Sequence, residues 1–103
     1  MGKSMNIDEG VKLFRETKDA ILIDVRYPFE YKQKHIPGSC NYTAQDIAKG
    51  NLENLGNLPK DTPIFVYCLS GSRSAKAMIV LEDLGYTNVT NIGGISAYSG
   101  PTE

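Results

Sequence analysis

Residues 64–85 read Ile64-Phe-Val-Tyr-Cys68-Leu-Ser-Gly-Ser-Arg73-Ser-Ala-Lys-Ala-Met-Ile-Val-Leu-Glu-Asp-Leu-Gly85, and the rest of the chain can be interpreted outward from them. The run from Ile64 to Tyr67 is apolar and aromatic and too short for a helix, which predicts a buried strand. The residues after Arg73 place apolar side chains at helical spacing and stop at Gly85, where a C-terminal glycine belongs. The side chains on this predicted apolar face are Ala77, Met78, Leu81 and Leu84.

A cysteine stands where the predicted strand meets the predicted helix. Cys68 is followed by a loop of small residues, and Arg73 comes at the start of the helix. Several backbone N–H groups can point inward at such a junction, and the helix dipole adds partial positive charge. Surroundings of this kind lower the pKa of a thiol from about 8.5 to roughly 3.5–7.5. The pattern therefore predicts a nucleophilic thiolate at neutral pH.

Composition excludes several classes of protein. The 103 residues predict one domain over 1–103, with a core large enough to fold without disulfides. The formal net charge of -1 gives no reason to expect nucleic acid or an anionic membrane as a partner. No apolar run approaches the ~20 residues that span a bilayer. Two cysteines without the apolar core of a signal peptide predict free thiols in a reducing, cytoplasmic compartment.

Strands and helices are predicted to alternate along the chain. Asn6 can cap a first helix with Glu9 reaching back to it, although Gly10 within that helix costs roughly 1 kcal/mol relative to alanine. A sharp turn is predicted at Gly93-Gly94. The predicted strands are 21–25, 39–41, 64–67 and 87–92, and the other helical segments are 29–34, 43–48, 52–58, the segment after Arg73, and 95–99.

This alternation predicts the α/β class, with a central mostly parallel sheet of four to five strands and helices on both faces. Connections between parallel strands should be right-handed crossovers. Ligands bind beyond the carboxyl ends of the strands in such folds. Three features of the sequence fall at those ends, namely 24–26, 68–73 and 93–94. We therefore expect a single site centred on Cys68.

Four segments together resemble the rhodanese domain family, over about Asn6 to Gly100. They are Ile23-Asp24-Val25-Arg26 with Glu30, His35-Ile36-Pro37-Gly38-Ser39, Cys68-Leu69-Ser70-Gly71-Ser72-Arg73-Ser74, and Asn91-Ile92-Gly93-Gly94-Ile95 with Tyr98. The resemblance implies a sulfurtransferase that carries sulfane sulfur as a persulfide on Cys68. The donor would be a small molecule such as thiosulfate, the acceptor cyanide or a thiol, and neither metal nor cofactor is called for. Lys34 stands where the family usually has glycine, and Tyr98 where it usually has tryptophan.

The length of the reactive loop separates this interpretation from a phosphatase. Four residues lie between Cys68 and Arg73, whereas the related phosphatases have five. A smaller cradle suits one extra sulfur atom rather than a phosphate group. The N–H groups of the loop are expected to hold the persulfide, with added hydrogen bonds from the hydroxyls of Ser70 and Ser72. The predicted binding loop consists of Leu69, Ser70, Gly71, Ser72, Arg73 and Ser74.

Other polar residues near the strand ends are predicted to be structural. Asp24 can hold loop N–H groups, and Arg26 and Glu30 are spaced to pair with each other. His35 is expected to be a hydrogen-bonded turn residue, because the chemistry needs no general base. Cys40 lies in a short strand without a basic neighbour and is expected to be a packed thiol. Arg73 has two open roles, since it can attract an anionic donor or brace carbonyls of the loop.

Three alternative functions remain open at this point. The domain can be a persulfide carrier that hands sulfur to a sulfur-relay protein. It can be a binding module without catalysis, although such versions of the family usually lack the cysteine. A cysteine-dependent phosphatase or arsenate reductase is the third alternative, which the short loop and the lack of an obvious acidic general acid disfavour.

Overall fold

The computed structural model describes residues 3–103, apart from the side chain of Asn54, and contains a five-stranded parallel sheet of order β1-β5-β4-β2-β3. The strands are β1 (Lys3–Ser4), β2 (Ile21–Asp24), β3 (Ser39–Asn41), β4 (Ile64–Cys68) and β5 (Val89–Gly94). The predicted α/β class and parallel sheet are confirmed. Strand β1 was not predicted, because two residues carry no alternation of polar and apolar side chains.

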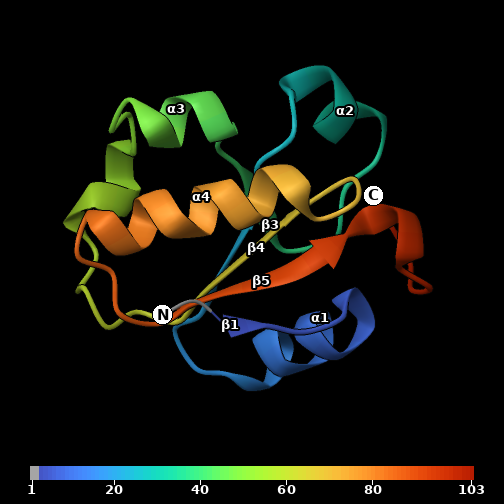
Figure 1. The fold of residues 1–103 in the computed structure, drawn as a ribbon. Helices are drawn as coiled ribbons and strands as arrows, with labels where there is room; N and C mark the ends of the chain where they lie inside the picture. The colour runs from blue at the N-terminus through green and yellow to red at the C-terminus, as the bar shows by residue number, and fades with distance from the viewer. Residues whose placement is uncertain (1–2) are drawn as a thin grey trace.

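Helices cover both faces of the sheet, as predicted (Figure 1). Helix α1 lies on one face, and α3 and α4 lie on the other, while α2 sits near the end of the sheet where α4 begins. The helices are α1 (Ile7–Glu16), α2 (Pro28–Gln33), α3 (Ala44–Ala48) and α4 (Ser72–Asp83), with 3-10 turns η1 (Glu53–Asn57) and η2 (Ile95–Ala97). No helix within residues 3–103 has the length and apolar character needed to cross a bilayer.

The central strand β4 is buried along its whole length, which its apolar sequence predicts. Because side chains alternate along a strand, Val66 and Cys68 face the core under α3 and α4. Phe65 and Tyr67 face the second core, which packs against α1. This alternation places the thiol of Cys68 on the face of the sheet where the following helix, α4, begins.

The prediction of a turn at Gly93-Gly94 is wrong, because both glycines belong to β5 and lie beside the end of β4. Cys68 lies opposite Gly94, after an irregularity in the register that begins at Val66. A Cβ atom at Gly94 would come within 2.0 Å of the carbonyl oxygen of Leu69. Glycine is therefore needed here so that the reactive loop can approach the strand, and not to reverse the chain.

Helix α1 begins at the predicted cap and contains a glycine for a packing reason. The side chain of Asn6 accepts a hydrogen bond from the backbone N–H of Glu9 at 2.9 Å. The carboxylate of Glu9 meets the side-chain amide of Asn6 instead of its backbone N–H, so the predicted capping box is only half formed. Gly10 is buried against Ile92 of β5, and a Cβ atom there would lie 2.3 Å from Ile92 Cγ2.

We predict that Gly10→Ala destabilises the protein by about 1–3 kcal/mol, because overpacking against Ile92 outweighs the gain in helix propensity. Urea denaturation of the two proteins measures the difference in the free energy of unfolding. Gly56→Ala is the matched control, since the nearest atom to an added Cβ there is 4.0 Å away. If Gly10→Ala raised stability by the roughly 1 kcal/mol expected from propensity alone, the packing explanation would be wrong.

Candidate active site

The reactive loop folds its backbone N–H groups toward the sulfur of Cys68. Gly71 precedes the first residue of α4 and has a φ of 109°, a left-handed conformation that glycine adopts without a steric penalty. In this conformation its N–H donates a hydrogen bond to Cys68 Sγ at 3.0 Å. The start of α4 also lies beside the sulfur, so the helix dipole acts in the same direction.

A buried hydroxyl completes the set of donors around the sulfur. Ser74 Oγ lies 3.4 Å from Cys68 Sγ, and the Ser74 residue is 0 % exposed. The sequence favours the hydroxyls of Ser70 and Ser72 for this role, but both residues are exposed. Ser74 is one helical turn beyond Gly71, which turns its side chain back toward the loop.

The surroundings of Cys68 favour its thiolate. Burial by itself raises the pKa of this thiol. The hydrogen bonds from the Ser74 hydroxyl and from the N–H groups of Ser74, Gly71 and Ser70 outweigh that effect and lower the pKa below the ordinary value for cysteine. The sequence predicts a lowered pKa, and the geometry gives its cause as hydrogen bonding to the charged form.

The second cysteine has the opposite environment. Burial raises the pKa of the Cys40 thiol, and its Sγ donates to the carbonyl oxygen of Leu22 at 3.4 Å. Strand β2 separates Cys40 on β3 from β4, so the two cysteines stand about 10 Å apart by strand spacing alone. A disulfide between them would need the backbone to move. Cys40 is therefore packed as the sequence predicted.

The loop also covers the thiol from solvent. Cys68 is 0 % exposed. Gly71 packs against the backbone of Gly93, where an added Cβ atom would lie 3.3 Å from Gly93 Cα. A reagent can therefore reach the sulfur only when residues around it move.

Asn91 holds the loop from the neighbouring strand, and the sequence analysis missed this role. Its Nδ2 donates to the carbonyl oxygen of Gly71 at 3.2 Å. Its Oδ1 accepts from the N–H of Gly93 at 3.0 Å and lies 2.7 Å from Ser74 Oγ, whose single proton is donated either to this oxygen or to Cys68 Sγ. The available signal in the sequence was a carboxamide side chain in a strand rich in β-branched residues, two positions before Gly93-Gly94.

Arg73 forms an ion pair with Glu30, a contact that the sequence analysis did not predict. Its Nη1 and Nη2 lie 2.8 and 3.2 Å from the two carboxylate oxygens of Glu30. The hydrogen bond from Arg73 holds the pKa of the Glu30 carboxyl below its usual value. This pair connects α2 to the first turn of α4, so the guanidinium braces the loop from outside.

The predicted pairing of Arg26 with Glu30 is wrong, because Arg26 pairs with Asp24. Residues two apart at a strand end share one side of the strand, whereas Glu30 points toward α4. The guanidinium of Arg26 meets both oxygens of Asp24, with Nη2–Oδ2 at 2.8 Å and Nε–Oδ1 at 3.0 Å. Asp24 also accepts the backbone N–H of Arg26 at 2.9 Å, as predicted for a carboxylate at this position.

His35 is hydrogen-bonded, as predicted, but it stands before the turn at Pro37-Gly38 and not in it. Its Nδ1 is 2.9 Å from the carbonyl oxygen of Tyr31, and its ring stacks on the Tyr31 ring with centroids 3.8 Å apart. The carbonyl at the end of α2, that of Lys34, accepts from Arg26 Nη2 at 2.7 Å. The buried pair of Asp24 and Arg26 and the stacked His35 therefore fix α2, which carries Glu30.

We predict that Ser74→Ala raises the pKa of Cys68 by about one to two units, since a hydrogen bond to a charged group contributes about 1.5–3 kcal/mol and one unit corresponds to about 1.4 kcal/mol. The ultraviolet absorbance of the thiolate as a function of pH measures the shift. Ser72→Ala is the matched control, because Ser72 is exposed. Equal titration curves for the two variants would contradict the assigned role of Ser74.

A family model and individual related proteins point to the same family. The family model described as "Rhodanese-like domain" matches residues 7–100. Thiosulfate sulfurtransferase PspE of Escherichia coli is 33% identical over 79 residues, which are 77% of this chain and 74% of that protein. A sulfurtransferase of Allochromatium vinosum is 35% identical over 82% of this chain and 76% of that protein.

Solved structures agree with the sequence comparison. A rhodanese-like domain protein from Staphylococcus aureus superimposes with a TM-score of 0.79 at 29% identity, over 98% of this chain and 96% of that one. A structure described as a rhodanese with anions from E. coli gives 0.71 at 31% identity, over 82% and 96%. The match of fold and sequence along almost the whole chain shows that this protein belongs to the rhodanese-like domain family of sulfurtransferases.

Proposed function

We propose that this chain transfers sulfane sulfur from a donor such as thiosulfate to a thiophilic acceptor, cyanide or a thiol, through a persulfide on Cys68. The observation that carries the proposal is the sulfur with a lowered pKa that accepts hydrogen bonds from the loop N–H groups and from Ser74. Relatives named sulfurtransferases support it.

The first half-reaction is a displacement at sulfur. The Cys68 thiolate attacks the outer sulfur of thiosulfate and forms a new S–S bond. The S–S bond of thiosulfate breaks, and its electron pair leaves on sulfite, so that one thiolate and one thiosulfate give one persulfide anion and one sulfite. Attack by the thiolate form needs no proton removal, and the lowered pKa of Cys68 increases the fraction of protein in that form.

The second half-reaction returns the enzyme to its starting state. The acceptor attacks the outer sulfur of the persulfide, and the electron pair of the breaking S–S bond returns to Cys68 Sγ. Cyanide gives thiocyanate, and a thiolate gives a persulfide of the acceptor. Two half-reactions joined by a covalent intermediate produce ping-pong kinetics.

The loop stabilises the intermediate by the same contacts that stabilise the thiolate. The N–H groups of Ser70, Gly71 and Ser74 converge on Cys68. When the loop moves to admit the donor, these dipoles can shift outward to the terminal sulfur, where the negative charge of a persulfide is carried. The bond between Asn91 Nδ2 and the Gly71 carbonyl limits that movement and keeps the N–H groups directed inward.

A phosphatase or arsenate reductase fits this geometry less well. A phosphate group needs a wide cradle and an arginine free to bind two of its oxygens. The guanidinium of Arg73 is occupied by both oxygens of Glu30, and the loop from Cys68 to Arg73 has only four intervening residues.

Both cysteines are free, which suits the reducing, cytoplasmic compartment that the sequence predicts.

Intact-mass measurement after incubation with thiosulfate tests the proposal directly. We expect the protein to gain one sulfur atom and to lose it when cyanide is added, with release of thiocyanate. Cys68→Ser should gain no sulfur, whereas Cys40→Ser should react like the natural sequence because Cys40 lies in another strand. Sulfur on the Cys68→Ser variant, or hydrolysis of an aryl phosphate in place of sulfur uptake, would refute the assignment.

A further inference from the structure

Two aromatic side chains lie on the surface beside the reactive loop. Phe29 is 64 % exposed and Tyr27 is 45 % exposed. Their rings stack with centroids 6.0 Å apart and an angle of 11° between the planes. The guanidinium of Arg73 lies 5.7 Å from the centroid of the Tyr27 ring. A stacked pair of exposed aromatic rings next to a reactive group is a candidate interaction site.

The aromatic pair continues into a groove between α3 and α4. Gln45 Nε2 donates to the hydroxyl oxygen of Tyr27 at 3.1 Å and also lines the groove. The groove has a volume of about 420 Å³. Its walls are the short apolar side chains of Ala44, Ala48, Ala77 and Val80. At its edge lie Arg73, which is paired with Glu30, and Lys76, which carries the positive charge there. The groove can therefore receive an apolar side chain beside a negative one.

Three lysines lie next to this surface, each about one helical turn after one of its residues. Lys32 follows Phe29 by three positions, Lys49 follows Gln45 by four, and Lys76 follows Arg73 by three, so each lies near its partner on the helix surface. The ion pairs found within residues 3–103 involve none of these three lysines. We call the set of Tyr27, Phe29, Gln45, the groove and the three lysines the docking surface.

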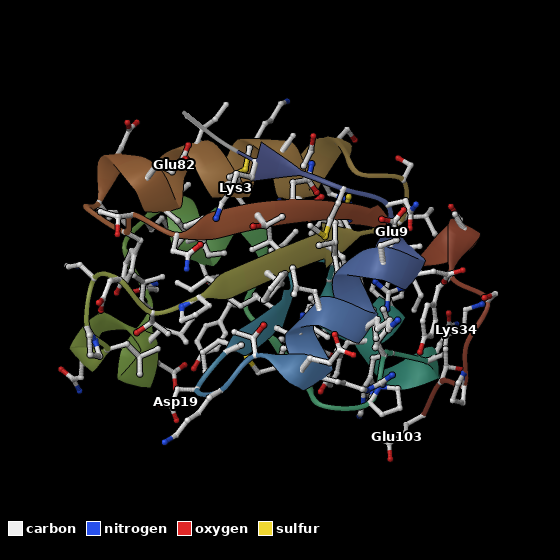
Figure 2. The ribbon with its side chains drawn as sticks, turned by 90° about the horizontal axis from the view of Figure 1, so that it is seen from below. Lys3, Glu9, Asp19, Lys34, Glu82 and Glu103 are labelled. Carbon is white, nitrogen blue, oxygen red and sulfur yellow. The ribbon has the colours of Figure 1, made fainter. Side chains whose placement is uncertain are left out.

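Acidic residues offset only part of the charge of these lysines. Of the two acids in α2 and α3, Glu30 is bound by Arg73, and Asp46 lies three positions before Lys49. Glu82 and Asp83 belong to the last turn of α4. Figure 2 shows Glu82 at the opposite end of the molecule from Lys34, the residue that follows α2. The docking surface is thus a cationic region on a chain whose net charge is -1.

We propose that the docking surface binds a protein partner that presents a thiol flanked by carboxylates and an apolar side chain, and that this partner receives sulfur from Cys68. The inference rests on the proposed persulfide and adds the place and the chemistry of recognition. Carboxylates complement the three lysines, and the apolar side chain enters the groove. Three lysines are few compared with the roughly 6–10 phosphate contacts of many DNA-binding proteins, which favours a protein over a nucleic acid.

The test uses protein already loaded with sulfur from thiosulfate, so that loading and transfer are measured separately. The acceptors are short synthetic cysteine peptides that contain leucine and either glutamates, glutamines or lysines, and 2-mercaptoethanol is the reference thiol. We expect transfer to the glutamate peptide to exceed transfer to the lysine peptide about tenfold at low ionic strength, and the difference to shrink as salt screens the charges.

Lys32→Glu combined with Lys76→Glu should reverse this preference without changing transfer to 2-mercaptoethanol. Lys12→Glu combined with Lys18→Glu is the matched control, since Lys12 belongs to α1 on the other face of the sheet and Lys18 follows that helix. Phe29→Ala should slow transfer to the glutamate peptide several-fold.

Three other results would contradict the proposal, and each would point to a different explanation. Equal rates for the three peptides, or equal effects of the two double variants, would refute the docking surface and leave the sulfurtransferase function standing. Salt-sensitive binding of transfer RNA that Lys32→Glu with Lys76→Glu abolishes would assign the surface to nucleic acid instead. Failure of thiosulfate to load Cys68 at all would remove the proposed function and this inference together.

Discussion

The hydrogen bond from the N–H of Gly71 to the sulfur of Cys68 is the interaction on which the site depends. It exists because the central strand β4 places the cysteine at the carboxyl end of the sheet and the following helix begins only four residues later. Between them the backbone must turn so that its N–H groups point inward, which Gly71 allows through its positive φ. A thiol buried without these donors would be held neutral, as Cys40 is.

Two arginine–carboxylate pairs support this loop in different ways. The pair of Asp24 and Arg26 is buried, and its guanidinium also reaches the carbonyl of Lys34, so it fixes α2 against the sheet. The pair of Glu30 and Arg73 is partly exposed and connects α2 to the first turn of α4. Breaking the buried pair would leave a charge without a partner, whereas the exposed pair is screened by water and can open. The loop therefore has one buried support and one partly exposed support.

Much of this arrangement could be predicted from the sequence because local patterns determine it. The apolar run of β4, the cap at Asn6 and the position of Cys68 follow from the spacing of neighbouring residues. The partners of Arg26 and Arg73 could not be predicted, since Glu30 is near Arg26 in sequence but is directed toward α4 by the fold. Asn91 was missed for the same reason, because its contacts with Gly71 and Ser74 cross between strands. Gly93-Gly94 resembles a turn in sequence, and only the packing of Leu69 against Gly94 shows why strand residues must be glycine.

The central claim is that this cradle of donors makes Cys68 ionise more easily than an ordinary cysteine. Carbon-13 NMR of protein labelled at the cysteine β-carbons follows both thiols in one sample as the pH is raised. The account predicts that Cys68 titrates below the ordinary value of about 8.5 and that Cys40 titrates above it. A titration midpoint for Cys68 at or above that of Cys40 would contradict the account.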